Sequence, residues 1–386
     1  MNKKIGLCVC YDTKNFGSQL QVLATDEQIK RLGYQTEIIR YKKKLSLAFV
    51  FQTLPRLFNP YFIKGKITRR RKNKNLEKHP EILNKVAVRD KRFEGFVEKH
   101  FQNLSKPFVG WEDLKKRSAD EYDSFLCGSD QLWLPGNLGS HFYTLEFVPD
   151  NKTKIAYATS FGVSQIPWYQ KKCTAAYLNR FQSLSTRELK GVQIIKDLTG
   201  KEAQVVCDPT LLLGADEWAK IIPSKRVIKE PYIFCYFLGT NSEHRKVARR
   251  LGDATGLKLV TCPFLDNFVE EDQQFGDIQM FDIDAEDFVN LIRHAEYVLT
   301  DSFHGSVFSI LHHKKFITFN RFGSESTSRN SRIDSLCELL ELNTRRYAGN
   351  IINQVKGEID YESVENKLHN LRAASVVYLE RALDKA

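Results

Sequence analysis

The sequence predicts an α/β fold made of two Rossmann-like halves. A strand, a helix and a second strand are indicated in succession near the N-terminus, at residues 5–10, 18–32 and 36–41. That order implies parallel strands joined by a right-handed crossover. A break in composition at residues 222–231 precedes a second series of alternating strands and helices. The chain has 386 residues, which is enough for two domains of ordinary size.

The first half is predicted to span residues 1–222. Its first helix carries Leu20, Leu23 and Ala24 on one face and stops at Gly33. Short apolar runs bounded by polar or Gly/Pro breaks are typical of buried parallel strands. Four more such runs occur in this half, at residues 122–127, 154–159, 183–186 and 204–207.

A strongly basic insert, at about residues 42–120, interrupts the first half. Between Arg40 and Asp120 the chain holds 22 Lys and Arg but only 8 Asp and Glu, and its total charge is +11. The insert opens with apolar and aromatic residues, continues in a cationic cluster at 69–72, and is predicted to be helical at 80–101. This charge pattern is typical of a nucleic-acid binder or of a protein that works beside an anionic membrane.

The second half is predicted to span residues 231–345. Asp284 is expected to cap a helix in which Phe288, Leu291, Ile292 and Ala295 share one face. Strands are indicated at residues 232–238, 258–261, 297–300 and 316–320, and further helices at 243–255 and 306–313. The remaining residues, 346–386, are predicted to form a helical tail that packs back on the first half. Two such halves predict a ligand cleft at the carboxyl ends of the strands.

The most informative segment, residues 299–310, runs from an apolar strand through a tight polar turn into a helix. The turn region holds Ser302, His304, Gly305 and Ser306. Free N–H groups and the helix dipole make such a junction an anion site. A histidine there can bind an anion as imidazolium or donate a proton. The alternative is that the turn only caps the helix and the histidine only packs.

Other strands also end in polar turns. Ser129, Asp130 and Gln131 follow one strand, and Ser160 follows the next. The acid and the amide suit the hydroxyls of a sugar, although an ordinary capped turn is an equal alternative.

Arg187 follows the strand at residues 183–186, where a guanidinium can bind phosphate or carboxylate through two parallel hydrogen bonds. A salt bridge with some acid is the alternative for this arginine. Residues 206–210 are interpreted as structural, because Pro209 fixes a turn after a strand.

These segments, in this order, resemble the polysaccharide pyruvyl transferase family. The resemblance runs from residue 5 to about residue 342 and includes an early loop with Asn15 and Gly17. It implies a fold similar to GT-B glycosyltransferases, with a cleft between two domains. It also implies transfer of a pyruvyl group from phosphoenolpyruvate to a sugar of a polysaccharide or lipid-linked oligosaccharide, which forms a cyclic ketal and releases phosphate. In some branches of the family an arginine stands where this chain has Ser302; we expect Arg332 to supply that cation.

The resemblance, with the turns above, assigns roles to individual residues. His304 is predicted to donate a proton, and Asp130 to bind or deprotonate the acceptor. The donor is expected to bind at Arg187, Ser302, Gly305, Ser306 and Arg332. The acceptor is expected to bind at Asn15, Gly17, Ser129, Gln131 and Ser160. No His, Cys, Asp and Glu residues show metal-ligand spacing, so no metal is expected, and no cofactor besides the donor substrate.

Two other classes of function stay open. A nucleotide-sugar glycosyltransferase has the same architecture, although the pair of glutamates eight residues apart that many retaining enzymes carry is missing from the second half. A non-catalytic membrane- or nucleic-acid-binding protein built around the basic insert is the other alternative. We expect no nucleic-acid partner, because the polar turns lie outside that insert.

The sequence predicts a cytoplasmic protein. It has no run of about 18 apolar residues and no signal-peptide cleavage site near the N-terminus. Its eight cysteines are mostly in apolar runs, as expected of buried side chains in a reducing compartment. Residues 45–72 are predicted to dock on the anionic inner leaflet, with packing on the first half or a dimer interface as alternatives. The oligomeric state stays open.

Overall fold

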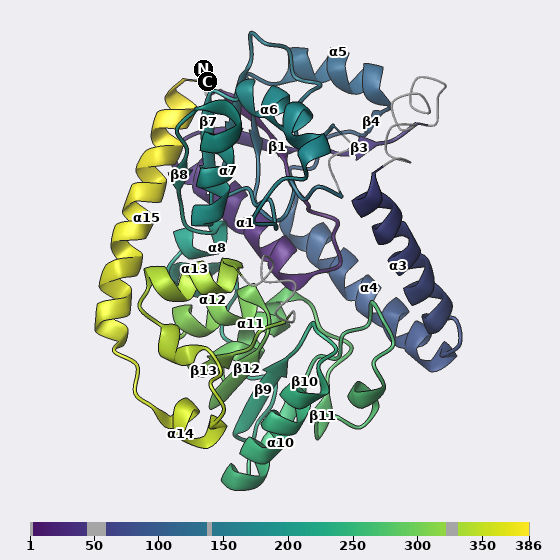
Figure 1. Ribbon diagram of the computed structural model, residues 1–386, viewed down its shortest axis with the longest axis vertical. Coiled ribbons are helices and arrows are strands. Elements are labelled where there is room, and N and C mark those ends of the chain that lie inside the picture. Colours follow the sequence, from purple (N-terminus) through teal and green to yellow (C-terminus); the bar gives the residue numbers. More distant parts are fainter. Residues whose placement is uncertain (1–2, 45–58, 137–140, 322–330, 386) are drawn as a thin grey trace.

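Two parallel β-sheets form the centre of the molecule, with helices around both (Figure 1). The structure, a computed structural model, describes residues 3–44, 59–136, 141–321 and 331–385. The first sheet belongs to the N-terminal half of the chain, and the second sheet lies below it in the view of Figure 1. The predicted α/β class with parallel sheets is confirmed.

The first sheet has the strand order β2-β1-β5-β6-β7-β8, and every neighbouring pair is parallel. Every residue of β5 and β7 is buried, as in a sheet covered on both faces. The strands are β1 (Lys4–Cys8), β2 (Gln35–Ile38), β5 (Ser124–Cys127), β6 (Thr153–Ala156), β7 (Ser183–Thr186) and β8 (Gln204–Val205). The helices of this half include α1 (Phe16–Arg31), α5 (Trp111–Glu121), α6 (Lys171–Asn179), α7 (Leu189–Thr199), α8 (Pro209–Leu212) and α9 (Ala215–Ile221).

The second sheet has the order β11-β10-β9-β12-β13 and is also parallel throughout. As predicted, the Asp284 carboxylate caps α11 by accepting from the backbone N–H groups of Glu286 and Asp287. The strands are β9 (Tyr232–Tyr236), β10 (Lys258–Thr261), β11 (Ile278–Gln279), β12 (Tyr297–Thr300) and β13 (Lys315–Thr318). Its helices are α10 (Ser242–Thr255), α11 (Ala285–Arg293), α12 (Phe303–Leu311), α13 (Ser331–Leu339) and α14 (Ile351–Lys356).

Two helices begin earlier than the sequence predicts. Helix α1 starts at Phe16 because the Asn15 side chain accepts from the backbone N–H of Ser18, which makes Asn15 the cap. Helix α12 starts at Phe303 because Ser302 caps it in the same way, on Gly305. Both helices therefore begin closer to the end of the preceding strand than the sequence predicts.

The basic insert contributes two long helices, α3 (Pro60–Leu76) and α4 (Pro80–His100), and a small sheet of β3 (Tyr41–Lys42) with β4 (Phe108–Val109). Pro60 is the first residue of α3, a position where its missing N–H costs nothing. The predicted membrane segment at residues 45–72 lies partly outside the described residues, since 45–58 are not described. No helix in the described ranges is both long enough and apolar enough to cross a bilayer.

An aromatic stack joins the two halves. The ring of Phe16 on α1 lies 5.0 Å from that of Phe93 on α4 and 5.0 Å from that of Phe288 on α11. Arg92 of α4 adds an ion pair with Asp287 of α11 at 2.6 Å. The N-terminus of α1 is therefore held against elements of both halves.

The C-terminal helix α15 (Tyr361–Asp384) runs along one side of the molecule, past both sheets, and ends near the N-terminus (Figure 1). The Ser375 hydroxyl accepts from the backbone N–H of Cys207 at 2.9 Å, and the Tyr378 hydroxyl donates to the carbonyl of Ala156 at 2.8 Å. The C-terminal helix therefore packs on the first half.

Candidate active site

Charged side chains from five separate segments meet where strands of the first sheet end. Asp130 follows β5, Arg187 follows β7 and Asp208 follows β8. His304 comes from the first turn of α12 and Arg332 from the first turn of α13, both in the second half. The carboxyl ends of parallel strands share one edge of a sheet, so these turns gather there although they are far apart in the sequence.

Arg187 is the centre of a buried ion-pair network. Its side chain is 1% exposed, and its guanidinium donates to the Asp208 carboxylate at 2.5 Å. A second guanidinium nitrogen lies 3.5 Å from the Asp130 carboxylate. The Ser18 hydroxyl on α1 donates to the other Asp130 oxygen at 2.7 Å. Asp130 is thus fixed from two sides, in a turn where its φ is 74°, a conformation that is rare for residues other than glycine.

His304 lies between the Asp208 carboxylate and helix α1. Its Nε2 is 3.6 Å from an Asp208 oxygen. The other side of the ring faces Gly17 so closely that a Cβ at Gly17 would lie 1.9 Å from His304 Nδ1. Only glycine leaves room there, so this residue of the first half sets the position of the histidine from the second.

Arg332 approaches the same cluster across the ring of Phe303. The guanidinium carbon of Arg332 is 5.8 Å from the ring centroid, and that of Arg187 is 5.0 Å from it, both within range of a cation–π contact. Burial and the charge of Arg187 lower the pKa of Arg332 to about 10. Arg332 stays positive at neutral pH and forms no ion pair with any residue that the structure describes.

The carboxylates respond to this arrangement in different ways. Burial alone would raise the pKa of Asp208, but His304 and Arg187 hold it well below its usual range. Burial also opposes ionisation of Asp130, yet Arg187, Arg332 and the Ser18 hydroxyl lower its pKa on balance. For Glu188, next to Arg187, burial wins and raises the pKa.

Four buried polar atoms in this cluster have no hydrogen-bond partner. They are Arg187 Nε, Glu188 Oε2, His304 Nε2 and Arg332 Nε. Buried polar groups are nearly always satisfied in folded proteins, so a concentration of unsatisfied ones indicates a place for a polar ligand or ordered water. Such a ligand would meet two guanidinium donors, an imidazole and carboxylate acceptors.

Several residues expected to bind the donor are used in building the turn. The Ser302 hydroxyl accepts from the backbone N–H of Gly305 at 3.3 Å, and the Ser306 hydroxyl donates to the carbonyl of Ser302 at 3.1 Å. A Cβ at Gly305 would lie 2.5 Å from Thr300 Oγ1. These side chains shape the N-terminus of α12 that carries His304.

Of the residues expected to bind the acceptor, some lie beside the charged cluster and others bond to the backbone of nearby turns. The Ser129 hydroxyl donates to the carbonyl of Ala158 at 2.9 Å and lies 3.4 Å from Arg187. Ser160 is fully buried and accepts from the backbone N–H of Gly162 at 3.1 Å. Asn15 is the cap of α1, and Gln131 is half-buried directly after Asp130.

Asp208 and Ser18 are the residues that the sequence interpretation missed. The sequence indicates a structural role for residues 206–210, and the structure adds a charged contact at Asp208. Asp208 does cap α8 by accepting from Thr210, but its other oxygen pairs with Arg187. The position of Asp208 directly after a predicted strand could have indicated a site residue, but the neighbouring Pro209 favours a structural turn. Within the described part of the chain, no three His, Cys, Asp or Glu side chains form a group suited to a metal ion.

We expect Gly17→Ala to lower kcat/KM by about 100-fold, because displacing a reacting group by about 1 Å has an effect of that size. The added Cβ would force the His304 ring out of place. Gly95→Ala on α4 is the matched control, since a Cβ there meets nothing within 4 Å. Equal activity of the two variants in a steady-state assay would show that the position of His304 does not matter.

Comparisons with known proteins identify the fold and the family of this chain. A search of curated sequences found no significant match. Among solved structures, the UDP-GlcNAc 2-epimerase of Methanocaldococcus jannaschii, in complex with UDP-GlcNAc and UDP, aligns over 100% of both chains with a TM-score of 0.50 and 12% identity. A protein of Listeria monocytogenes provisionally described as the same kind of enzyme aligns over 98% of this chain and 91% of its own, with a TM-score of 0.50 and 10% identity.

At such low identity these structures show the fold alone, and that fold is the expected GT-B-like arrangement of two α/β halves. The sequence itself matches the model of one protein family, the polysaccharide pyruvyl transferases, over residues 15–321. The match spans well over half of the chain and includes Asp130, Arg187, Asp208 and His304. The chain therefore belongs to the polysaccharide pyruvyl transferase family.

Proposed function

We propose that the protein transfers a pyruvyl group from phosphoenolpyruvate to two hydroxyls of a saccharide, forming a cyclic ketal and releasing phosphate. The observation that supports this most is the meeting of His304 with two guanidinium groups in one buried cluster, with four polar atoms left unsatisfied. Phosphoenolpyruvate carries a phosphate and a carboxylate, and both are natural ligands of guanidinium donors.

In the proposed site the donor binds next to Phe303. Arg332 offers a cation without an ion-pair partner among the described residues, so it is the better candidate for direct contact with the phosphate or carboxylate. Arg187 already donates to Asp208. Its Nε has no hydrogen bond but lies 4.0 Å from Glu188 Oε2, so the main effect of Arg187 is to hold the cluster together. The N-terminus of α12 adds a favourable dipole.

His304 is the proposed general acid. It donates a proton to C3 of phosphoenolpyruvate, which becomes a methyl group, while a saccharide hydroxyl attacks C2 and gives up its proton. The ionised Asp208 carboxylate, 3.6 Å from Nε2, attracts the protonated imidazole and orients it. A positioned acid of this kind contributes about 10²–10⁴ in rate.

Asp130 is the proposed acceptor-side group. Its carboxylate, held by Ser18 and Arg187, takes the proton of the attacking hydroxyl or binds the sugar. A second hydroxyl then attacks C2, the bond to phosphate breaks, and the released phosphate carries away the second proton. Asn15, Gly17, Ser129, Gln131 and Ser160 form the surroundings in which we propose that the acceptor sugar lies.

We further propose that the saccharide acceptor is linked to a lipid. The enzyme would then work at the inner leaflet of a membrane, as a peripheral protein without a spanning segment in its described ranges. We also propose the following division of the chain. The first domain ends at residue 222, the second begins at residue 231, and the C-terminal tail begins at residue 346.

The decisive experiment is incubation of the purified protein with phosphoenolpyruvate and a set of lipid-linked oligosaccharides. Phosphate release together with a mass gain of one pyruvyl ketal supports the proposal. Nucleotide sugars are tested in parallel, and glycosyl transfer without pyruvyl gain would overturn it. Thermal stabilisation by phosphoenolpyruvate but not by nucleotide sugars is the matching binding test.

We expect Arg332→Ala to weaken donor binding by about 10- to 100-fold, since a hydrogen bond to a charged group contributes about 1.5–3 kcal/mol. Arg332→Lys should rescue only partly, because lysine keeps the charge but loses the planar fork. The measurement is the dissociation constant of phosphoenolpyruvate by calorimetry. Arg250→Ala, at an exposed position on α10, is the control, and identical affinities in both alanine variants would remove Arg332 from the donor site. Arg187→Ala and Arg187→Lys, measured in the same way, separate direct donor contact from support of the cluster.

A further inference from the structure

Helix α3 is an unusually cationic surface element. It carries seven Lys and Arg and no Asp or Glu within its 17 residues. Most of its described side chains are exposed. None of the seven cations forms an ion pair with a described residue, although Lys66 lies over the ring of Phe62 and Lys72 over that of Phe264. The charge is therefore not neutralised within the molecule and is available to an external anion.

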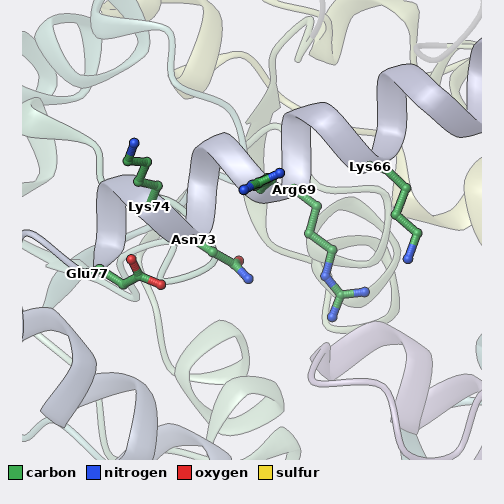
Figure 2. Close-up of a pocket in the computed structure, with 6 residues that line it drawn as sticks. Lys66, Arg69, Asn73, Lys74 and Glu77 are labelled. Atoms are coloured by element: carbon green, nitrogen blue, oxygen red, sulfur yellow. The ribbon is translucent and has the colours of Figure 1, made fainter.

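The exposed side of α3 combines these cations with apolar side chains. Ile63 and Ile67 are 40% and 48% exposed. They fall on the same helical stripe as Arg70 and Lys74, which follow at intervals of three and four residues. In Figure 2, Lys66, Arg69 and Asn73 project to the same side of the helix, while Lys74 points away from them. The hollow of about 490 Å³ between these side chains is lined by Lys66, Arg69, Arg70, Asn73, Lys74 and Glu77.

The helix is fixed to the body of the protein and does not behave as a tail. Leu76 at its C-terminal end is buried with Ile82 of α4 and Leu265 of the second half. Lys72 lies 5.5 Å from the ring centroid of Phe264. Figure 1 places α3 on the outer side of the molecule, next to α4. The charges therefore have a fixed direction relative to the candidate active site.

A small cavity lies between the aromatic ring that contacts Lys72 and the N-terminus of α1. Phe264, the ring under Lys72, lines a cavity of about 40 Å³ together with Asn15 and Phe16 at the N-terminus of α1. The next residue along α1, Gly17, is the one that touches His304. Phe264 thus contacts α3 through Lys72 and shares a cavity with the N-terminus of α1, whose Gly17 faces His304.

We propose that α3 docks the protein on an anionic lipid bilayer. Ile63 and Ile67 enter the headgroup region, and the surrounding cations bind lipid phosphates, as in other interfacial helices. The exposed isoleucines favour a bilayer over a nucleic acid, which offers no apolar phase for them. This inference rests on the proposed function only for its purpose, which is to hold the active site close to a lipid-linked acceptor.

The test is co-sedimentation of the full chain with phosphatidylcholine vesicles, with or without phosphatidylglycerol. We expect binding only to the anionic vesicles, and less of it as salt is raised. Charge reversal at Lys66, Arg70 and Lys74 to Glu should weaken partitioning by roughly 100-fold or more, given the contribution of each cation at such a surface. The matched control reverses exposed Lys171, Lys172 and Lys190, with the same change of net charge.

A second pair of variants separates lipid from other polyanions. Ile63→Ser with Ile67→Ser should weaken binding to anionic vesicles and leave any binding to duplex DNA unchanged. Three results would overturn the proposal: equal recovery in the supernatant with both vesicle types, equal effects of the two charge-reversal sets, or vesicle binding that the serine variants do not alter. Since these assays contain neither donor nor acceptor, their outcome does not depend on the outcome of the pyruvyl-transfer assay.

Discussion

Replacing His304 with alanine is expected to lower kcat by about 10²–10⁴, the usual contribution of a positioned general acid. The Nδ1 side of the ring contacts Gly17, and the buried Nε2 lies 3.6 Å from the Asp208 carboxylate without a hydrogen-bond partner. No other described histidine lies in this cluster, so no second imidazole is available to take over the proton transfer. The measurement is single-turnover phosphate release from phosphoenolpyruvate with a saturating acceptor.

Two further variants make that result specific. His304→Gln keeps most of the volume and the contact with α1 but provides no imidazole, and it should be nearly as slow as the alanine variant. His313→Ala removes an exposed histidine just after the same helix and should retain full activity. A His304→Ala enzyme that keeps its activity would show that His304 takes no part in the reaction. A variant that is inactive because it no longer shows a cooperative melting transition would show that His304 is needed for folding instead.

Replacing Asp208 with alanine is expected to lower the free energy of unfolding by about 3 kcal/mol or more. The pair with Arg187 is almost fully buried, with side chains 0% and 1% exposed, and removal of one partner leaves a buried charge. Asp130 at 3.5 Å offsets part of that loss. Urea unfolding of the wild type, both single variants and the Asp208→Ala/Arg187→Ala double variant gives the coupling between the two residues. Additive losses in that cycle would contradict a direct interaction.

The same pair gives unfolding a specific dependence on pH. The folded-state pKa of Asp208 lies well below its usual range, with burial opposed by His304 and Arg187. For a depressed carboxyl pKa the stabilisation is present above the unfolded value of about 3.9 and is lost as pH falls below it. The difference in stability between the wild type and Asp208→Asn should therefore be largest near neutral pH and should shrink as the pH falls below about 4.

Local patterns in the sequence determined much of the fold. The runs at residues 122–127 and 183–186 are apolar enough to be recognised as buried strands, and β5 and β7 are found there. The position of Asp284 before an apolar helical stripe likewise predicts a helix cap, and its side chain caps α11. Such signals are short-range, because burial periodicity and capping involve residues within one or two turns of each other.

The family resemblance and the strand-end turns also predict several of the residues that meet in the candidate site. Asp130, Arg187 and His304 each follow a predicted strand, and the structure brings them together. The sequence also indicates Arg332 as a cation that follows the second-half turn, and the structure places it at the ring of Phe303. The proposed roles of these residues wait for the measurements above.

The contacts between the side chains of the site follow only from the tertiary structure. Asp208 is 21 positions from Arg187, and no periodicity predicts that one carboxylate holds both Arg187 and His304. The hydroxyls of Ser302 and Ser306 each form a hydrogen bond with the backbone of the first turn of α12, which the sequence pattern does not reveal. The need for glycine at position 17 comes from a ring in the other half of the chain. Long-range burial sets which charges pair and which atoms stay unsatisfied, because the strength of an electrostatic contact depends on the solvent that the whole fold excludes.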